Sequence, residues 1–312
     1  MRLQTAVLLA LTLLVGAGVA DRALAWPPDL MPADALPLKA ALRAEAPAPK
    51  AKATPTTVPP AAACCAVLEL RQYTLKPGQR DALIDLFDRY FLTGQEAVGV
   101  QVVGQFRDLD DPDRFVWLRG FPDMPTRAAG LAAFYDGPVW RAHREAANAT
   151  MLDSDNVLLL RPAIAGSGFA DATPVTPSPA PLPPASPPPG MPPAGHGMLV
   201  ATLYYPFPAH DTAAAQELAD AFARDGAPAL SAAGGPVMAA LVTHSEPNNF
   251  PRLPVREGEA VFIIFQAFAD AAAYDRYRAH VATPWWRGHV LKGAPEVHRL
   301  APTSGSRWQG PL

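Results

Sequence analysis

The chain has 312 residues, of which 49% are hydrophobic, 18% are charged and 37 are prolines. This length is enough for about two domains. The formal net charge is −3 and the sequence pI is near 6.2, so no basic surplus is available to neutralise phosphates or to hold an anionic membrane. We therefore expect no nucleic-acid partner.

The N-terminus has the pattern of an export signal. Arg2 precedes an apolar run from Ala6 to Ala20, which is shorter than the ~20 residues that span a bilayer, and small residues suited to cleavage follow it. We predict a signal peptide over residues 1–25 and an exported protein, periplasmic or secreted, with no stable membrane span after cleavage. An uncleaved N-terminal anchor is the alternative.

Two proline-rich segments divide the rest of the chain. Residues 26–63 and 166–197 are rich in Ala and Pro and lack hydrophobic periodicity, so they cannot bury enough apolar surface to offset their ordering entropy. We predict that both are disordered linkers. Compact domains are expected over residues 64–165 and 198–302, followed by a tail over 303–312.

The two cysteines, Cys64 and Cys65, are adjacent, so a disulfide between them cannot cross-link distant parts of the fold. A vicinal disulfide, an intermolecular bridge and a pair of free thiols all remain open in an oxidising compartment. We expect a structural or incidental role for them. No metal site is predicted.

In the first block, hydrophobic spacing predicts the order strand, helix, strand, strand, helix, strand. Leu68 and Leu70 alternate with polar side chains, as in a strand with two different faces, whereas apolar residues after Gly78 recur at helical spacing. Asp and Pro residues between the two middle strands favour a hairpin turn. Gly137 and Pro138 interrupt the second helical stretch. The expected elements are residues 66–75, 76–91, 98–108, 114–121, 123–150 and 156–163.

The second block repeats this order over residues 198–207, 211–225, 236–246, 259–268, 270–293 and 296–302. Asp211 or Thr212 is a suitable N-cap for its first helix. The motif Pro, any residue, Trp, Arg, any residue, His occurs in both blocks, over residues 138–143 and 284–289. We interpret the chain as an internal duplication.

Each motif predicts a helix that begins at its proline, because the N–H that proline lacks would be unpaired there anyway. Trp140 and His143 then lie three residues apart on one helical face. Two interpretations stay open. Either the Trp anchors the helix on its sheet and the His satisfies a buried polar group, or the imidazole and Arg141 bind an anionic or carbonyl group. The corresponding residues of the second block are Trp286, Arg287 and His289.

The chain resembles the NIPSNAP family in four stretches: ELRQYTLKPGQRDALIDLFDRYF, FVWLRGF, FYDGPVWRAHREAANATM and THSEPNNFPRLPVREGEAVFIIF. The resemblance implies an α+β fold of the dimeric α/β-barrel type. Two tandem ferredoxin-like (βαββαβ) units would each place a four-stranded antiparallel sheet against the other, with the helices outside. We expect a pseudo-dimeric barrel within one monomeric chain, and closure between two chains of a homodimer stays open.

Within that fold, the first strand predicts a polar barrel interior. If Leu68 and Leu70 face the helices, Glu69, Arg71 and Tyr73 face the barrel. A solvated sheet face is the alternative. A half-polar, half-apolar cavity between the two sheets would suit a small organic ligand. The candidate cavity residues are Glu69, Arg71, Tyr73, Trp117, Arg119, Trp140, Arg141, His143, Tyr205, Gln266, Trp286, Arg287 and His289.

The loop NNFPRLPVREGE contributes Asn248, Asn249 and Arg252 as a candidate rim for a ligand or a partner. The alternative is a hairpin extension that packs across the neighbouring domain.

Three classes of function compete. We favour an exported, non-catalytic binding or interaction protein over an enzyme. The first alternative is a small monooxygenase or isomerase, cofactor-independent or haem-handling, with His143, His289, Tyr73 and Tyr205 as the acid or base groups. The second is a structural protein of envelope assembly. No cofactor is predicted, and no residue pattern supports haem. Phosphate-binding, nucleophile-elbow and HEXXH motifs do not occur in the sequence.

Overall fold

The computed structural model describes residues 64–169, 197–281 and 284–308. The predicted signal peptide and first linker lie outside these residues, as does most of the predicted second linker. Within the described parts of the chain, no helix is long and apolar enough to cross a membrane.

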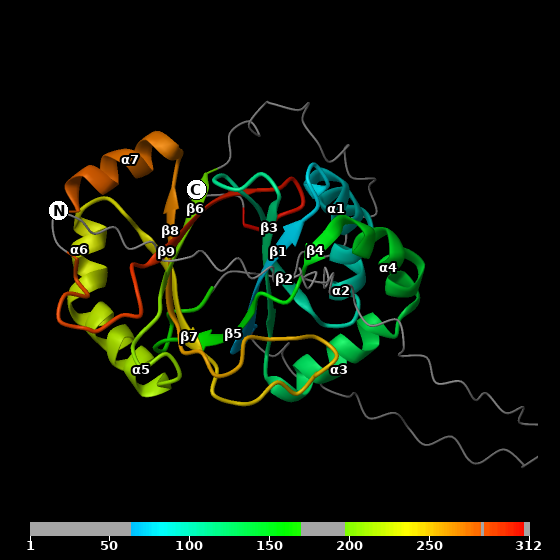
Figure 1. Ribbon diagram of the computed structural model, residues 1–312, viewed down its shortest axis with the longest axis horizontal. Helices are drawn as coiled ribbons and strands as arrows, with labels where there is room; N and C mark the ends of the chain where they lie inside the picture. Colours follow the sequence, from blue (N-terminus) through cyan, green and yellow to red (C-terminus); the bar gives the residue numbers. More distant parts are fainter. Residues whose placement is uncertain (1–63, 170–196, 282–283, 309–312) are drawn as a thin grey trace, which may run out of the picture.

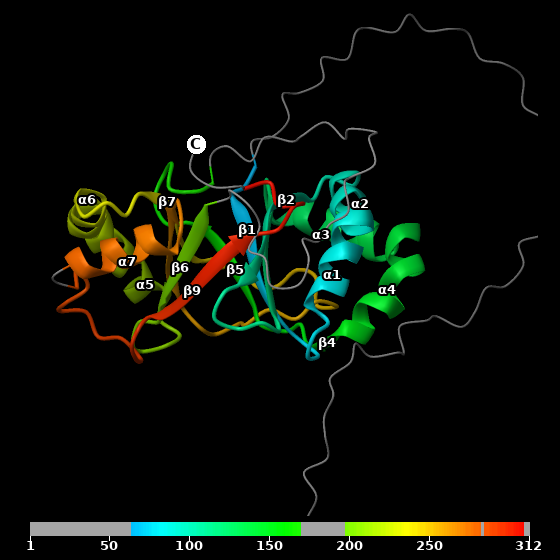
Figure 2. The ribbon, with the colours of Figure 1, turned by 90° about the horizontal axis from the view of Figure 1, so that it is seen from above.

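Among the described residues, eight antiparallel strands form a closed barrel (Figures 1 and 2). Their order around the barrel is β3-β2-β9-β6-β8-β7-β5-β1, and β1 pairs with β3 to close it. A short strand, β4 (Met151–Asp153), pairs with the end of β1. The barrel strands are β1 (Val67–Leu75), β2 (Gln101–Asp108), β3 (Arg114–Phe121), β5 (Val157–Pro162), β6 (Met198–Tyr204), β7 (Val237–Thr243), β8 (Phe262–Phe268) and β9 (Glu296–Pro302).

The two halves of the chain contribute four strands each, in the same order. The first half is ordered β5-β1-β3-β2 and the second half β9-β6-β8-β7. The half-sheets join edge to edge through two pairings, β2 with β9 and β5 with β7. Each edge strand therefore finds its partner within the same chain, which leaves no open sheet edge at either joint.

Helices cover the outside of each half-sheet and lie on opposite sides of the barrel (Figure 1). Asp123 and Asp270 start equivalent helices, α3 and α7, by accepting hydrogen bonds from Thr126 N and Ala273 N, both at 2.7 Å. Asp211 caps α5 in the same way. The helices of the first half are α1 (Arg80–Leu86), η1 (Phe87–Phe91), α2 (Leu92–Glu96), α3 (Met124–Tyr135) and α4 (Pro138–Thr150); those of the second are α5 (Thr212–Ala221), η2 (Phe222–Gly226), α6 (Ala227–Ala232) and α7 (Ala271–His280).

The two repeated motifs fold differently. Pro138 starts α4, as predicted. The prediction of a second helix at Pro284 is wrong, because the backbone from Pro284 onward forms turns, with hydrogen bonds from Arg287 N to Pro284 O and from His289 N to Trp286 O. Gly288 has a φ of +105°, a left-handed conformation that ends helical geometry at that residue.

The barrel interior is apolar, contrary to the expected polar cavity. Leu68 and Leu70 point inward and pack with the inward side chains of both halves in one buried cluster. Tyr73 and Trp117 belong instead to the core between the first half-sheet and its helices. The predicted alternation is correct, but the assignment of its two faces is reversed. The interior cluster includes Leu68, Leu70, Val116, Leu118, Leu158, Leu160, Leu199, Leu203, Leu241, Ile263, Phe265 and Leu300.

The loop between β7 and β8 reaches from the second half to the helices of the first half (Figure 1). Its Phe250 and Leu253 are part of the first half's helix–sheet core. Asn249 Nδ2 donates to the Met124 carbonyl at 2.6 Å, and Arg252 forms an ion pair of 2.7 Å with Asp136. The loop therefore packs across the neighbouring half, which is the alternative interpretation of its sequence.

Candidate functional site

Four charged side chains form a buried cluster between the first half-sheet and α3. Glu69 and Arg71 lie on β1, Arg119 lies opposite Glu69 on β3, and Arg127 comes from α3. All four are 0% exposed. We call this set, Glu69, Arg71, Arg119 and Arg127, the arginine cluster.

Glu69 is the shared acceptor of the arginine cluster. Its Oε2 accepts hydrogen bonds from Arg71 Nη1 at 2.6 Å and from Arg119 Nε at 2.8 Å, and its Oε1 accepts from Arg127 Nε at 2.7 Å. Burial alone would raise the pKa of Glu69, but Arg119, Arg71 and Arg127 together hold that pKa well below its usual range. The carboxylate is therefore ionised at neutral pH.

The arginine cluster carries more positive than negative charge. Burial alone would lower the pKa of Arg71, but Tyr73 and Glu69 raise it above its ordinary value. Burial lowers the pKa of Arg127, and the nearby Glu69 carboxylate opposes this effect. The ordinary pKa of arginine is so high that the guanidinium stays charged after this decrease. Three guanidinium groups against one carboxylate leave two positive charges out of contact with water.

The three arginines also donate hydrogen bonds to residues outside the arginine cluster, which lie on several elements. Arg71 Nε donates to the Tyr73 hydroxyl at 2.8 Å, and Arg119 Nη1 donates to Gln95 Oε1 at 3.1 Å. Arg127 Nη1 donates to the side-chain oxygens of two residues in the β7–β8 loop, Asn248 at 3.1 Å and Asn249 at 2.7 Å. The second half of the chain thus completes the surroundings of the cluster.

A small cavity of about 30 Å³ adjoins the arginine cluster. The guanidinium carbons of Arg71 and Arg119 lie 5.7 and 5.2 Å from the centre of the Trp117 ring. Three buried nitrogen atoms of the cavity lining and the arginine cluster, Trp117 Nε1, Arg71 Nη2 and Arg127 Nη2, have no acceptor among the described residues. The cavity is lined by Tyr73, Leu83, Phe87, Phe91, Gln95, Trp117, Phe134, Tyr135, Trp140, Met151 and Ser154.

Six of the candidate residues predicted from the sequence meet at this place, although on the helix-facing side of the sheet and not inside the barrel. They are Glu69, Arg71, Tyr73, Trp117, Arg119 and Trp140. Their correct grouping follows from strand alternation, which places Glu69, Arg71 and Tyr73 on one face whichever way that face points. Their role in ligand binding remains a prediction.

The other two residues of the first motif do not join this cavity's lining. Arg141 donates to the backbone carbonyls of Gly137 and Asp136. His143 stacks on Tyr90, with ring centroids 3.7 Å apart. Trp140 alone among the motif's three side chains lines the cavity.

The candidates of the second half are dispersed. Gln266 Nε2 donates to the Tyr277 hydroxyl and the Gly235 carbonyl in the helix–sheet core, so its expected position inside the barrel is wrong. Trp286 packs beside Tyr204 on the same side, with ring centroids 5.2 Å apart. Arg287 and His289 lie in the turns after Pro284.

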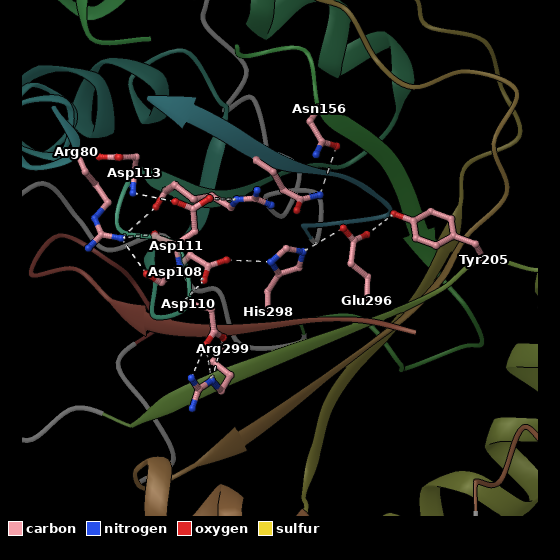
Figure 3. Close-up of polar contacts among 12 residues, drawn as sticks. Arg80, Asp108, Asp110, Asp111, Asp113, Asn156, Tyr205, Glu296, His298 and Arg299 are labelled. Atoms are coloured by element: carbon pink, nitrogen blue, oxygen red, sulfur yellow. Dashed lines mark hydrogen bonds and ion pairs between the residues drawn. The ribbon is translucent and has the colours of Figure 1, made fainter. Parts of the chain in front are cut away.

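Tyr205 lies at one end of the barrel interior, in a polar network that sequence reasoning missed (Figure 3). Its hydroxyl donates to Glu296 Oε2 at 3.0 Å and accepts from Arg256 Nη1 at 3.2 Å. Beside Glu296, His298 Nδ1 bonds Asp108 Oδ2 at 2.9 Å, joining β9 to β2. Nothing local in the sequence marks this pair, because its members are 190 residues apart.

A larger, half-open cleft of about 230 Å³ lies under the base of the β7–β8 loop. Burial lowers the pKa of His244, which lines it. Asn248, a predicted rim residue, lines this cleft and also accepts from Arg127, so it separates the cleft from the arginine cluster. The cleft is lined by residues 243–248 and 255–260 together with Leu159, His210 and Thr212.

Cys64 and Cys65 are joined as a vicinal disulfide, and Cys65 packs in the barrel core. In the described part of the chain, no group of three or more His, Cys, Asp or Glu side chains could hold a metal ion.

The outer helices and the closed eight-stranded antiparallel barrel of the described residues define the class as a mixed α/β protein built on a barrel. Residues 68–164 match the model of the NIPSNAP family. This part of the chain is therefore a NIPSNAP domain.

Solved structures match the chain at low identity. A NIPSNAP-like domain protein from Burkholderia xenovorans is 23% identical, with 41% of this chain and 97% of that chain covered and a TM-score of 0.31. A NIPSNAP family protein of unknown function from Agrobacterium tumefaciens is 21% identical, with 31% and 88% covered and a TM-score of 0.29. A putative monooxygenase from Lactobacillus acidophilus is 14% identical, with 77% and 97% covered and a TM-score of 0.45. No curated protein matches the chain.

Proposed function

We propose that the protein is an exported, non-catalytic binding protein that holds a small molecule in the cavity between the first half-sheet and its helices. The observation that carries this proposal is Trp117, which is 2% exposed, lines the cavity and has an indole N–H without an acceptor among the described residues. A buried donor without a partner costs roughly 1–3 kcal/mol. A ligand that accepts from it removes that cost.

The second half acts in this proposal as an intrachain partner. The same strand order in both halves supports two ferredoxin-like units that arose by duplication. In the second unit the space between sheet and helices is filled by apolar and aromatic side chains, including Phe262, Ile264 and Trp285. The second unit therefore closes the barrel and supplies the β7–β8 loop, whereas the first unit holds the ligand.

The positions of the acid–base candidates favour binding over catalysis. Tyr73 lines the cavity, His143 stacks on Tyr90, Tyr205 lies at the barrel end, and His289 lies in a turn after the last helix. General acid–base work needs its groups within hydrogen-bond reach of one reacting site. These four side chains are not gathered at one site.

Native mass spectrometry tests this proposal. The full chain, purified from the compartment to which it is exported, is measured beside a denatured sample of the same preparation. We expect an additional mass that is lost on denaturation and is reduced in a Trp117→Phe variant, which keeps a ring in the cavity but removes the N–H. Native and denatured samples of equal mass, with no change in tryptophan fluorescence on adding extracts of that compartment, would contradict the proposal.

A further inference from the structure

We infer that the molecule bound in this cavity is an anion, whose carboxylate or similarly small oxyanion group is held by Arg71 and Trp117 and balances the charge of the arginine cluster. This inference rests on the proposed function, and it names the chemical class of the ligand.

The charge balance of the arginine cluster is the first argument. Each of the three arginines forms its ion pair with Glu69, and among the described residues no second carboxylate is paired with any of them. Asp155 is near enough for Arg71 to lower its pKa, but burial has the larger effect and raises that pKa. A buried charge without a counter-charge is strongly unfavourable. A further negative group beside the cluster would therefore be electrostatically stabilised.

The positions of the free donors are the second argument. Arg71 donates from Nε to Tyr73, which lines the cavity, while its Nη2 has no acceptor among the described residues. Its guanidinium carbon lies 5.4 Å from the Tyr73 ring centre and 5.7 Å from that of Trp117. The unpaired N–H groups of Arg71 and Trp117 therefore belong to neighbouring side chains, and Arg71 lies directly behind two residues of the cavity lining, Tyr73 and Trp117.

The size of the cavity limits the bound group. A volume of about 30 Å³ limits the bound group to a few heavy atoms. Planar carboxylates bind guanidinium groups through charge-assisted hydrogen bonds. Phe87, Phe91 and Phe134 line the same cavity and suit an apolar substituent on the carboxylate carbon. A short-chain carboxylate fits these features, and a small inorganic oxyanion shares the same charge and donors.

Anion titrations of the full chain test the inference. Sodium formate, sodium acetate and sodium nitrate are each added in exchange for sodium chloride, so that the ionic strength stays constant, with acetamide as the neutral match for acetate. Melting temperature and tryptophan fluorescence are recorded. We expect saturable responses to formate and acetate and none to acetamide. A response to nitrate alone would assign the site to an inorganic oxyanion.

Two variants and one control test which residues bind the anion. Arg71→Gln should abolish the acetate response, and Trp117→Phe should weaken acetate binding about tenfold, as expected for one hydrogen bond to a charged group. The control is Arg89→Gln, because Arg89 lies on η1 in the same half of the chain and its side chain is 59% exposed. This variant should leave the acetate response unchanged. If Arg71→Gln does not fold, Trp117→Phe decides alone.

The two proposals fail in different ways. If acetamide binds as tightly as acetate, or if acetate binding is equal in wild type and Trp117→Phe, the anion inference is wrong while ligand binding can still stand. If no anion produces a response but native mass spectrometry finds a neutral ligand, the inference is again wrong. The absence of any bound mass together with the absence of any anion response removes both proposals.

Discussion

Arg127 on α3 donates from Nη1 to the side-chain oxygen of Asn249, 122 residues later in the chain, at 2.7 Å. This hydrogen bond joins the buried arginine cluster of the NIPSNAP domain to a loop of the second half. The loop adds Phe250 and Leu253 to the same core. Residues of the second half therefore complete the core of the NIPSNAP domain.

Replacing Asn249 tests how much this contact stabilises the fold. Asn249→Ala removes an acceptor for Arg127 and a donor to the Met124 carbonyl, so we expect the free energy of unfolding to fall by about 1–2 kcal/mol. Arg252→Ala, which removes the solvent-exposed ion pair with Asp136, should cost less than about 1 kcal/mol. Urea denaturation measures both values. Equal losses in the two variants would contradict this ranking.

Removing the central carboxylate should be more damaging. Glu69→Gln leaves three buried guanidinium groups without a counter-charge, and we expect a loss of about 3–5 kcal/mol of stability at neutral pH. Acetate should partly restore the melting temperature of this variant, since it supplies a negative group to the same cluster. A loss below about 1 kcal/mol would show that Glu69 does not hold the arginines in place.

The same carboxylate predicts a pH dependence. The pKa of Glu69 is lower in the folded protein than its ordinary value of about 4.3, so its contribution to stability is present above that value and is lost as the pH falls toward the folded-state pKa. The stability difference between wild type and Glu69→Gln should therefore be constant above about pH 5 and shrink below about pH 4. Denaturant titrations over this range check the trend. A difference that grows on acidification would contradict it.

The buried pair of Asp108 and His298 should stabilise the joint between the two halves. Asp108 is 3% exposed and His298 is 7% exposed, so His298→Ala leaves the carboxylate without one of its partners and should cost about 1–3 kcal/mol. His280→Ala is the control, because His280 is exposed at the end of α7, and we expect a change within about 0.5 kcal/mol. Thermal unfolding of both variants tests the difference, and similar melting temperatures would refute the assigned role of the pair.

The vicinal disulfide lies against β3 at Gly120. A methyl group at this glycine would overlap the sulfur of Cys65, so Gly120→Ala should lower stability by about 1–3 kcal/mol. Gly293→Ala is the matched change, because nothing lies within 4 Å of the methyl group it would add. Melting temperatures of the two variants measure the difference. A Gly120→Ala protein as stable as wild type would mean that the cysteines are not packed on this strand.

Local sequence was sufficient for the eight barrel strands, although not for the short strand β4, for most helices and for the residues that share a face. Alternation places Glu69, Arg71 and Tyr73 together, because successive side chains of a strand point to opposite sides wherever the strand lies. It also identified six of the residues that meet at the arginine cluster and its cavity. The predicted ranges 123–150 and 270–293 begin at the residues that cap α3 and α7, since a helix start depends on the cap and the next few residues.

Which face of β1 turns inward was decided only by the tertiary structure. The sequence by itself determined the two sets, Leu68 and Leu70 on one side and Glu69 and Arg71 on the other. The closed barrel brings together the apolar sets of eight described strands, whereas partners for the charged set come from α2, α3 and the β7–β8 loop. Those partners are up to 122 residues away from the arginines they bind. A period of two defines two faces, but burial against distant residues determines which of them is the core.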